Sequence, residues 1–419
     1  MSIFIIRKNA YMSSELYSGF SDVARQAMMQ PQESMLEVKT KKNKLYIGIP
    51  KETSFQENRI ALTPLSVALL INNGHEVMLE SNAGQAANFS DKDYSDQGAK
   101  IVYDTKSVYD ADLIIKIAPP TMHEIGLMKP HQILISTLQI SVLKADCLHA
   151  LIQKKITALS FEHLRDEGGS LSVVRAMSEI VGATSILIAA EYLSNIFDGK
   201  GLMLGGITGV PPTEIVILGA GTVGEYAART AIAVGAEVKV FDPSIYKLRR
   251  LQNNIGTRVF TSVVQPIVLE KAITTCDVAI GALRAEDGRS PCIVSESTVS
   301  RMKPNSVIID VSIDQGGCFE TSEVTNHTHP VFRKYDVIHY CVPNIASRVA
   351  RTATYALTNI FTPILLDIGE QGGLKNVIWQ KSGVRNSVYI YDGHLTNKHI
   401  GERFNIPCKD LDLLIVSHR

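Results

Sequence analysis

Short apolar runs alternate with longer amphipathic segments along most of this chain. Runs of Val, Ile and Leu without polar alternation predict strands that are buried on both faces, as in parallel sheets. The segments between them, many ending at Gly, predict helices. This alternation predicts an α/β fold with two Rossmann-like, doubly wound parallel sheets. The first unit has predicted strands at 45–49, 75–81, 111–118, 131–139 and 156–164, and a helix–turn–strand segment at 91–102. The second unit is predicted to hold about six parallel strands, among them 214–218, 237–242, 277–283, 306–312 and 336–342.

Two long apolar segments, 172–195 and 351–369, predict helices that connect these units. The first is expected to lead into the second unit. The second is too apolar to stand alone, so we expect it to return and pack on the first unit. The first domain is therefore predicted to be discontinuous, with residues 44–172 and 351–419 enclosing a dinucleotide-binding domain of residues 173–350. Residues 1–43 are predicted to form an N-terminal extension, either a surface arm or an oligomer contact.

The run GAGTVG, from Gly219 to Gly224, follows the apolar strand at 214–218 and opens a helix of small residues. Gly219 allows a tight turn, Gly221 lets the backbone approach a pyrophosphate, and Gly224 lets the helix pack closely on the sheet. Thr222 and Val223 complete the turn. The N–H groups at the start of the helix then face the phosphates. The order strand, glycine turn, helix and strand predicts a dinucleotide site.

An acid ends the strand after this helix. Asp242 lies about 20 residues beyond the first glycine, where a carboxylate can hold the adenosine ribose hydroxyls. The same charge repels a 2′-phosphate, so NAD is the predicted cofactor. Lys247 lies nearby and leaves NADP as the second possibility.

Composition narrows the function classes. The 419 residues are long for one domain and suit two. Lys plus Arg equals Asp plus Glu, 42 each, so no electrostatic signal favours nucleic acid or a membrane surface. The six cysteines form no Cys-x-x-Cys pairs, which predicts neither a disulfide framework nor a metal site. With no cleavage signal and no apolar run expected to span a membrane, the sequence predicts a soluble, cytoplasmic protein.

Several segments together resemble the alanine dehydrogenase and transhydrogenase α-subunit family, and the soluble alanine dehydrogenases most. The resemblance covers most of the chain beyond the extension. The matching segments are IGIPKET, ENRIALTP, LMLGGITGVPPTEIVILGAGTVG, RMKPNSVIIDVSIDQGGCFE and HYCVPNIASRVARTATYALTN.

The resemblance implies roles for individual residues. Arg59, in ENRIALTP, is similar to the arginine that binds the substrate carboxylate, a role that the fork of donors on guanidinium suits. Asp314, in IDQGG, looks like the active-site aspartate and would orient the nicotinamide ribose or the reacting amine. Asn344 is expected on the nicotinamide side. Ser178 resembles a serine near the cofactor phosphates, although a plain helical serine is the alternative.

The chain departs from the family pattern at two catalytic positions. Where alanine dehydrogenases carry a lysine for the keto oxygen and a histidine as acid/base, this chain has Ala118 and Gln139. Gln139 can hydrogen-bond a substrate carbonyl or water but cannot carry a proton. Lys116, two residues before Ala118, is the candidate for partial replacement as a catalytic residue.

Three interpretations follow. The first is an NAD-dependent amino-acid dehydrogenase that converts L-alanine, NAD and water to pyruvate, ammonia and NADH, with altered acid/base residues. The second is an NAD-binding family member without dehydrogenase activity, and the third is a transhydrogenase-like NAD subunit. The retained Arg59 and Asp314 favour the first, and the lost lysine and histidine favour the second. Family members are usually hexamers, so a homo-oligomer is expected.

Overall fold

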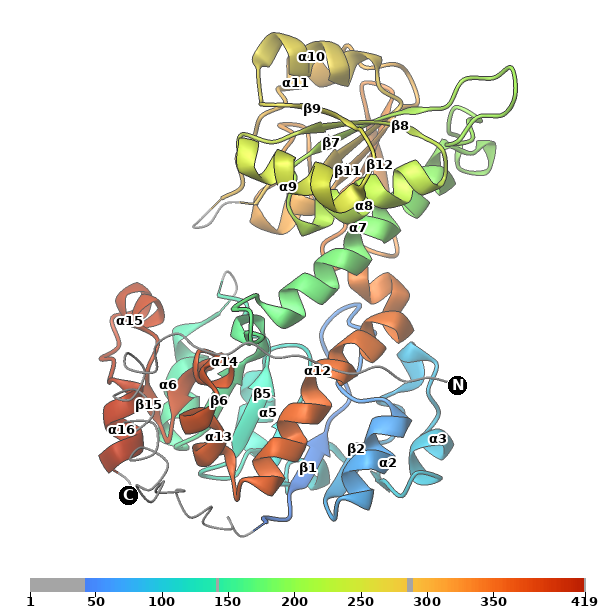
Figure 1. Ribbon diagram of the computed structural model, residues 1–419. Helices are drawn as coiled ribbons and strands as arrows, with labels where there is room; N and C mark the ends of the chain where they lie inside the picture. Colours follow the sequence, from blue (N-terminus) through green and yellow to red (C-terminus); the bar gives the residue numbers. More distant parts are fainter. Residues whose placement is uncertain (1–41, 141–142, 285–288, 418–419) are drawn as a thin grey trace, which may run out of the picture. The chain divides into compact units, whose positions relative to one another are not determined.

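The computed structural model describes residues 42–140, 143–284 and 289–417, and their strands form two sheets (Figure 1). The predicted extension at 1–43 lies almost wholly outside the described residues. Both sheets are mostly parallel and flanked by helices, which confirms the predicted α/β class.

The first sheet has eight strands in the part of the chain that is described. The six strands from β6 to β3 are parallel, as their apolar runs predict. β14 pairs antiparallel with β6, and β15 pairs antiparallel with β14, so this edge differs from the parallel sheet that the sequence predicts. In sheet order the strands are β15 (His394–Leu395), β14 (Val388–Tyr391), β6 (Thr157–Ser160), β5 (Ile133–Ser136), β4 (Leu113–Ile115), β1 (Tyr46–Ile49), β2 (Glu76–Glu80) and β3 (Lys100–Val102).

Helices cover both faces of the first sheet. One apolar core lies under α2, α3, α12 and α13, and another lies under α5, α6 and α15. The helices of this part are α2 (Pro64–Asn72), α3 (Asp91–Ser95), α4 (Thr105–Val108), α5 (Met122–Leu127), α6 (Ala145–Gln153), α12 (Ala350–Glu370), α13 (Leu374–Gln380), α14 (Ser382–Arg385), α15 (Lys398–Phe404) and α16 (Leu411–Ser417).

The second sheet has seven strands among the described residues, and only the edge strand β12 is antiparallel. Helices α8 and α9 cover one face, while α10 and α11 cover the other (Figure 1). The strands in sheet order are β12 (Val331–Lys334), β13 (Val337–Tyr340), β11 (Val307–Asp310), β10 (Val278–Gly281), β7 (Glu214–Leu218), β8 (Glu237–Phe241) and β9 (Phe260–Ser262). The helices are α8 (Thr222–Ala233), α9 (Ile245–Ile255), α10 (Pro266–Thr275) and α11 (Glu296–Val299).

The C-terminal part of the chain contributes to the first sheet. Leu357, Phe361 and Leu365 on α12 are buried in the same core as β1 and β2, and β14 extends the sheet beyond β6. The apolar face that α12 showed in the sequence is thus covered by the first sheet's core. The domain boundaries themselves stay a prediction.

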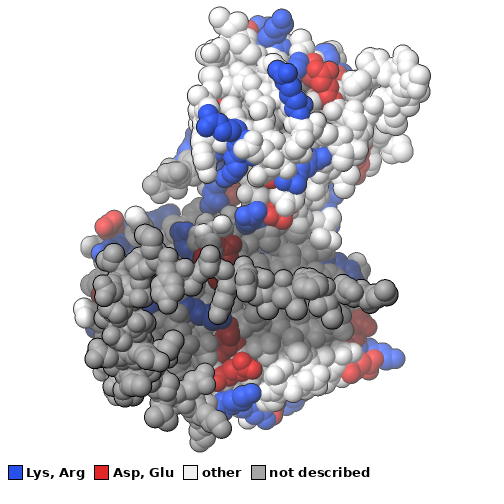
Figure 2. Space-filling model, in the orientation of Figure 1, with Lys and Arg blue, Asp and Glu red and all other residues white. Residues whose placement is uncertain are grey.

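The long helix α7 (Ser172–Leu193), predicted from the sequence as a long apolar helix but not as a membrane span, is by length and composition apolar enough and long enough to cross a membrane. This is weak evidence, because a core helix passes the same test. Of its most apolar stretch, 44% is buried in the structure, and α7 packs against both α8 and α12. Over the described residues on the face shown in Figure 2, basic and acidic side chains are interspersed, in keeping with the zero net charge.

Candidate active site

The glycine turn between β7 and α8 is closed by backbone contacts that leave no room for side chains. Gly219 has φ of +117°, and a Cβ there would lie 2.5 Å from the carbonyl oxygen of Ala282. A Cβ on Gly224 would lie 1.9 Å from the carbonyl oxygen of Gly219. Only glycine fits either position, because Cβ contacts below 3.0 Å are not found in proteins.

The same turn opens toward a ligand at Gly221. A Cβ on Gly221 would meet no atom within 4 Å, and Gly221 is the N-cap of α8 without a side-chain hydrogen bond. The first N–H groups of α8, beginning with those of Thr222 and Val223, therefore lie beside open space, where a helix favours an anion. These residues fit the pyrophosphate of a dinucleotide.

Asp242 lies at the end of β8 and ties the turn to the next loop. Its carboxylate accepts the N–H of Ala220 at 2.7 Å and the N–H of Ser244 at 2.7 Å, and the residue is 2% exposed. Each carboxylate oxygen keeps a second lone pair for a ribose hydroxyl. Lys247, on α9, is exposed.

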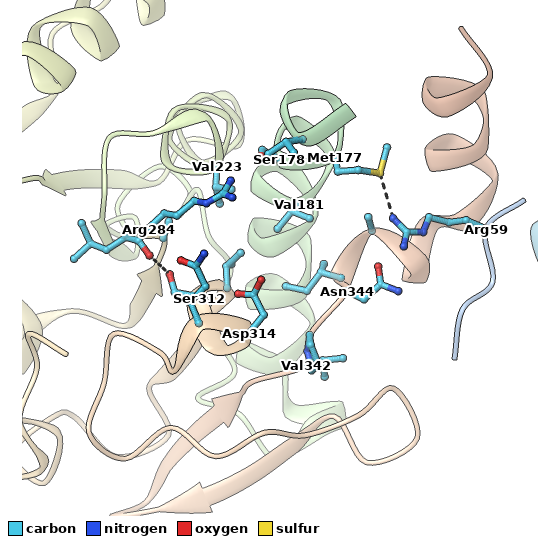
Figure 3. Close-up of a pocket in the computed structure, with 18 residues that line it drawn as sticks. Arg59, Met177, Ser178, Val181, Val223, Arg284, Ser312, Asp314, Val342 and Asn344 are labelled. Carbon is cyan, nitrogen blue, oxygen red and sulfur yellow. Dashed lines mark hydrogen bonds between the residues drawn. The ribbon is translucent and has the colours of Figure 1, made fainter. Parts of the chain in front are cut away.

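A cavity of about 290 Å³ lies beside α7 and collects many of the predicted residues (Figure 3). Arg59, Ser178, Val223, Asp314 and Asn344 all line it. They come from the loop after β1, from α7, from the glycine turn and from the ends of β11 and β13. The carboxyl ends of parallel strands are where open α/β sheets bind their ligands.

Arg59 meets the cavity as half of a buried ion pair. Its Nε and Nη2 donate to the two carboxylate oxygens of Glu57 at 2.7 and 2.6 Å, with side chains 11% and 5% exposed. Nη1 points to the sulfur of Met177 at 3.5 Å (Figure 3). Glu57 also accepts the side-chain N–H of Asn344 at 3.0 Å. The guanidinium plane is therefore fixed, and the Nη1 edge is the one turned toward α7.

Asp314 lies in a short 3₁₀ turn, η4 (Val311–Gln315), directly after β11. Burial of its carboxyl raises the pKa of Asp314, and the charge of Arg284 opposes this rise. The loop is shaped by Asp310, which is fully buried and accepts the N–H groups of Ser312 and Cys318. Desolvation also raises the pKa of Asp310. The Asp310 carboxylate therefore fixes the backbone of the loop from which Asp314 lines the cavity.

Lys116 is not brought to this cavity. Its side chain is fully buried, with Nζ 2.7 Å from Glu124 and 3.8 Å from Glu52. A lysine held between two buried carboxylates is committed to an internal ion pair. This geometry argues against the predicted catalytic role of Lys116.

The two positions that lack proton carriers also lie outside the cavity lining. Ala118 is 2% exposed, and its N–H donates to Glu52 at 3.3 Å. Gln139 is exposed, with φ of +45°, and its N–H donates to Glu162 at 3.3 Å. Its role in binding substrate stays a prediction.

Sequence reasoning missed three residues of this region. Glu57 lies only two residues before Arg59, a spacing that could have indicated a partner for the guanidinium. Arg284 follows the strand β10 at its carboxyl end, the same position rule that singled out Asp314. Met177 gave no signal, because an apolar residue on a long helix is usually part of the core.

Comparison with known proteins covers nearly all of the described chain. The family model for the alanine dehydrogenase/PNT N-terminal domain matches residues 48–181, and that for the C-terminal domain matches residues 185–398. An alanine dehydrogenase of Mycolicibacterium smegmatis is 37% identical over 372 residues, 87% of this chain and 98% of the relative. One of Methanococcus maripaludis is 38% identical over 365 residues, 87% and 97% of the two chains. A solved L-alanine dehydrogenase structure superposes with a TM-score of 0.80 at 34% identity, covering 86% of this chain and 99% of the other.

Proposed function

Because the chain belongs to the alanine dehydrogenase/PNT family over most of its length, we propose that it oxidises L-alanine with NAD and water to pyruvate, ammonia and NADH. Its relatives at 35–38% identity are alanine dehydrogenases, so it is of that type and uses NAD. The proposal adds that its acid/base residues differ, because Ala118 and Gln139 cannot carry protons.

The observation that supports this best is that Arg59 and Asp314 line one cavity with the glycine turn residue Val223. A protein that only stores or senses NAD has no evident need for an arginine beside its cofactor site. At about 290 Å³, the cavity is near the lower end of the range of about 300–1,000 Å³ typical of small-molecule sites, so it suits a small substrate.

Each residue then has a defined task. The Nη1 edge of Arg59 binds the substrate carboxylate, while Glu57 holds the guanidinium plane through the other two nitrogens. Asp314 accepts a hydrogen bond from the substrate amine and so fixes the position of the nitrogen. The bound NAD supplies the hydride acceptor for the substrate Cα. Holding amine and carboxylate at fixed points presents the Cα hydrogen in one orientation, which lowers the entropic part of the barrier.

The test is amino-acid-dependent NADH formation by purified protein, screened over the common L-amino acids. We expect activity with L-alanine that disappears in Arg59→Ala, while the Kd for NAD measured by calorimetry stays the same. Arg351→Ala is the matched control, since Arg351 packs over Phe89 outside the cavity and should keep the activity. NAD binding without turnover of any amino acid would favour the alternative, an NAD-binding family member without dehydrogenase activity.

We also propose a cytoplasmic location and a homo-oligomeric, hexameric assembly. The support is the resemblance to soluble alanine dehydrogenases, together with the lack of paired cysteine motifs in the sequence. Sedimentation velocity of the full chain tests the assembly.

A further inference from the structure

The end of β6 holds a histidine in a hydrogen-bonded arrangement that the proposed reaction does not yet use. His163 closes the 3₁₀ turn η2 (Phe161–His163), which follows β6. β5 is the neighbouring parallel strand, and Leu138 and Gln139 follow its end. The carboxyl edge of the first sheet therefore places His163 beside the position from which a family histidine is missing.

Glu162 connects the two positions. Its Oε2 accepts the N–H of Leu138 at 2.9 Å and the N–H of Gln139 at 3.3 Å. The same oxygen accepts the hydroxyl of Ser160 at 3.2 Å, and the Ser160 oxygen lies 3.1 Å from Nδ1 of His163. A continuous set of hydrogen bonds thus runs from the backbone of Gln139 to the imidazole.

This arrangement fixes the imidazole tautomer. A carboxylate only accepts hydrogen bonds, so the hydroxyl of Ser160 donates its hydrogen to Glu162. The Ser160 oxygen then accepts from Nδ1–H of His163, which leaves the lone pair on Nε2. A carboxylate that orients an imidazole with an available lone pair is the arrangement of a general base.

Burial favours the neutral form of the imidazole. Burial lowers the pKa of His163, and Arg165 and Arg284 lower it further, while Glu162 raises it. His163 is not among the residues that line the cavity, but Arg284 lines it and lowers the pKa of both His163 and Asp314, so the imidazole and the Asp314 carboxyl share one charged neighbour.

We propose that His163 is the proton carrier of this enzyme, with Ser160 and Glu162 as its positioning residues; this rests on the proposed amino-acid oxidation. The substrate ammonium group first loses a proton to solvent, and the nitrogen lone pair forms the C=N bond as the Cα–H bond breaks and hydride passes to NAD. The water oxygen then bonds to the imine carbon, and one water proton passes to Nε2 of His163. His163 gives that proton to the nitrogen, the C–N bond breaks, and the remaining hydroxyl proton passes to Nε2 as the C=O bond forms, so the products are keto acid and ammonia. No oxidant other than NAD is needed.

The experiment compares wild type, His163→Gln and His131→Gln by L-alanine-dependent NADH formation from pH 5 to 9. His131 is the matched control, because it is exposed and paired with Asp392 at 2.7 Å. We expect His163→Gln to lower kcat about 10²-fold or more at pH 7 and to remove the loss of rate at acid pH, and His131→Gln to do neither.

Gln139→His in the His163→Gln background should restore part of the rate. Ser160→Ala should lower kcat less than His163→Gln and shift the acid limb.

A second readout does not depend on turnover. In histidine-labelled wild type with NADH, the His163 ring signals, assigned with His163→Gln, should report an Nδ1–H tautomer and shift on addition of pyruvate, while His131 signals should not. Wild-type activity with an unaltered rate and pH profile in His163→Gln would overturn the role of His163 alone. A His163 signal that does not shift on addition of pyruvate would also overturn the role of His163. If, in addition, wild type turned over no amino acid, the proposed function would be overturned as well.

Discussion

At the scale of single residues, Glu57 accepts hydrogen bonds from two of the three guanidinium nitrogens of Arg59. The proposed substrate carboxylate would therefore bind the same guanidinium group as the Glu57 carboxylate. Removing one partner of a buried ion pair leaves the other charge uncompensated, which costs about 3–5 kcal/mol. We expect Glu57→Gln to raise the KM for L-alanine at least about tenfold, the equivalent of about 1.4 kcal/mol, and to lower the free energy of unfolding. Steady-state kinetics and urea unfolding measure these effects. The control is Glu179→Gln, which breaks an exposed pair with Arg175 and should change neither.

A second residue-scale prediction concerns Glu52, which lies between Lys116 and the backbone of Ile117 and Ala118. Burial raises its pKa from 4.5 to about 7, against the opposing effect of Lys116. The folded state thus holds the proton more tightly than the unfolded chain, so the stability linked to protonation is complete below pH 4.5 and is lost as the pH rises to 7. The glutamine of Glu52→Gln does not titrate. The free energy of unfolding of this variant, relative to that of wild type, should therefore increase as the pH rises from 4.5 to 7. Urea unfolding of both proteins between pH 4 and 8 measures the difference, and a constant difference would contradict the prediction.

At the scale of elements, different glycines at the start of α8 serve packing and ligand binding. Gly224 has no space for a Cβ, whereas Gly221 has open space and a φ of −74° that alanine adopts without strain. We expect Gly221→Ala to fold with nearly the wild-type Tm but to bind NAD at least about tenfold more weakly, since its methyl group fills space that suits the pyrophosphate, a change of about 1.4 kcal/mol. Gly224→Ala should lower the Tm instead. Thermal unfolding and calorimetry of both variants distinguish the two roles, and equal NAD affinity in Gly221→Ala would be the contrary result.

At the scale of the whole molecule, the two sheets differ in how the chain builds them. All seven strands of the second sheet come from residues 214–340, whereas the first takes β14 and β15 from the far end of the chain. We expect a fragment of residues 173–350 to fold and bind NAD, and a fragment of residues 44–172 to remain unfolded or aggregate. Circular dichroism and NAD calorimetry of both fragments check this. A cooperatively folded 44–172 fragment would contradict the predicted discontinuous domain.

The parallel strands and the glycine turn could be predicted because their signals are local. The apolar run of β7 is buried as its composition predicts. Gly219 and Gly224 are required because backbone atoms a few residues or one strand away leave no space for a Cβ. The antiparallel pairing of β14 could not be predicted, because its partner β6 lies more than 200 residues earlier and neither run shows alternation.

Site residues could be predicted where their position at the end of a strand determines their location. They could not be predicted where the location depends on which side chain a residue pairs with in the folded protein. Asp314 follows β11, so its place at the sheet edge came from topology. Lys116 also follows a strand, but Glu124 on α5 turns it inward, and no local pattern shows that choice. The link from Gln139 to His163 depends on a carboxylate between them, which only the folded chain reveals.

The pairing of β14 with β6 also has a consequence during synthesis of the protein. A ribosome has made the whole second sheet before it reaches residue 388, so through that time β6 has no strand on its outer side. An unpaired edge of apolar residues is a template for pairing with other chains. The nascent polypeptide therefore keeps this edge unpaired until β14 has been made, and any stall of translation between β6 and β14 would leave the edge open to other chains.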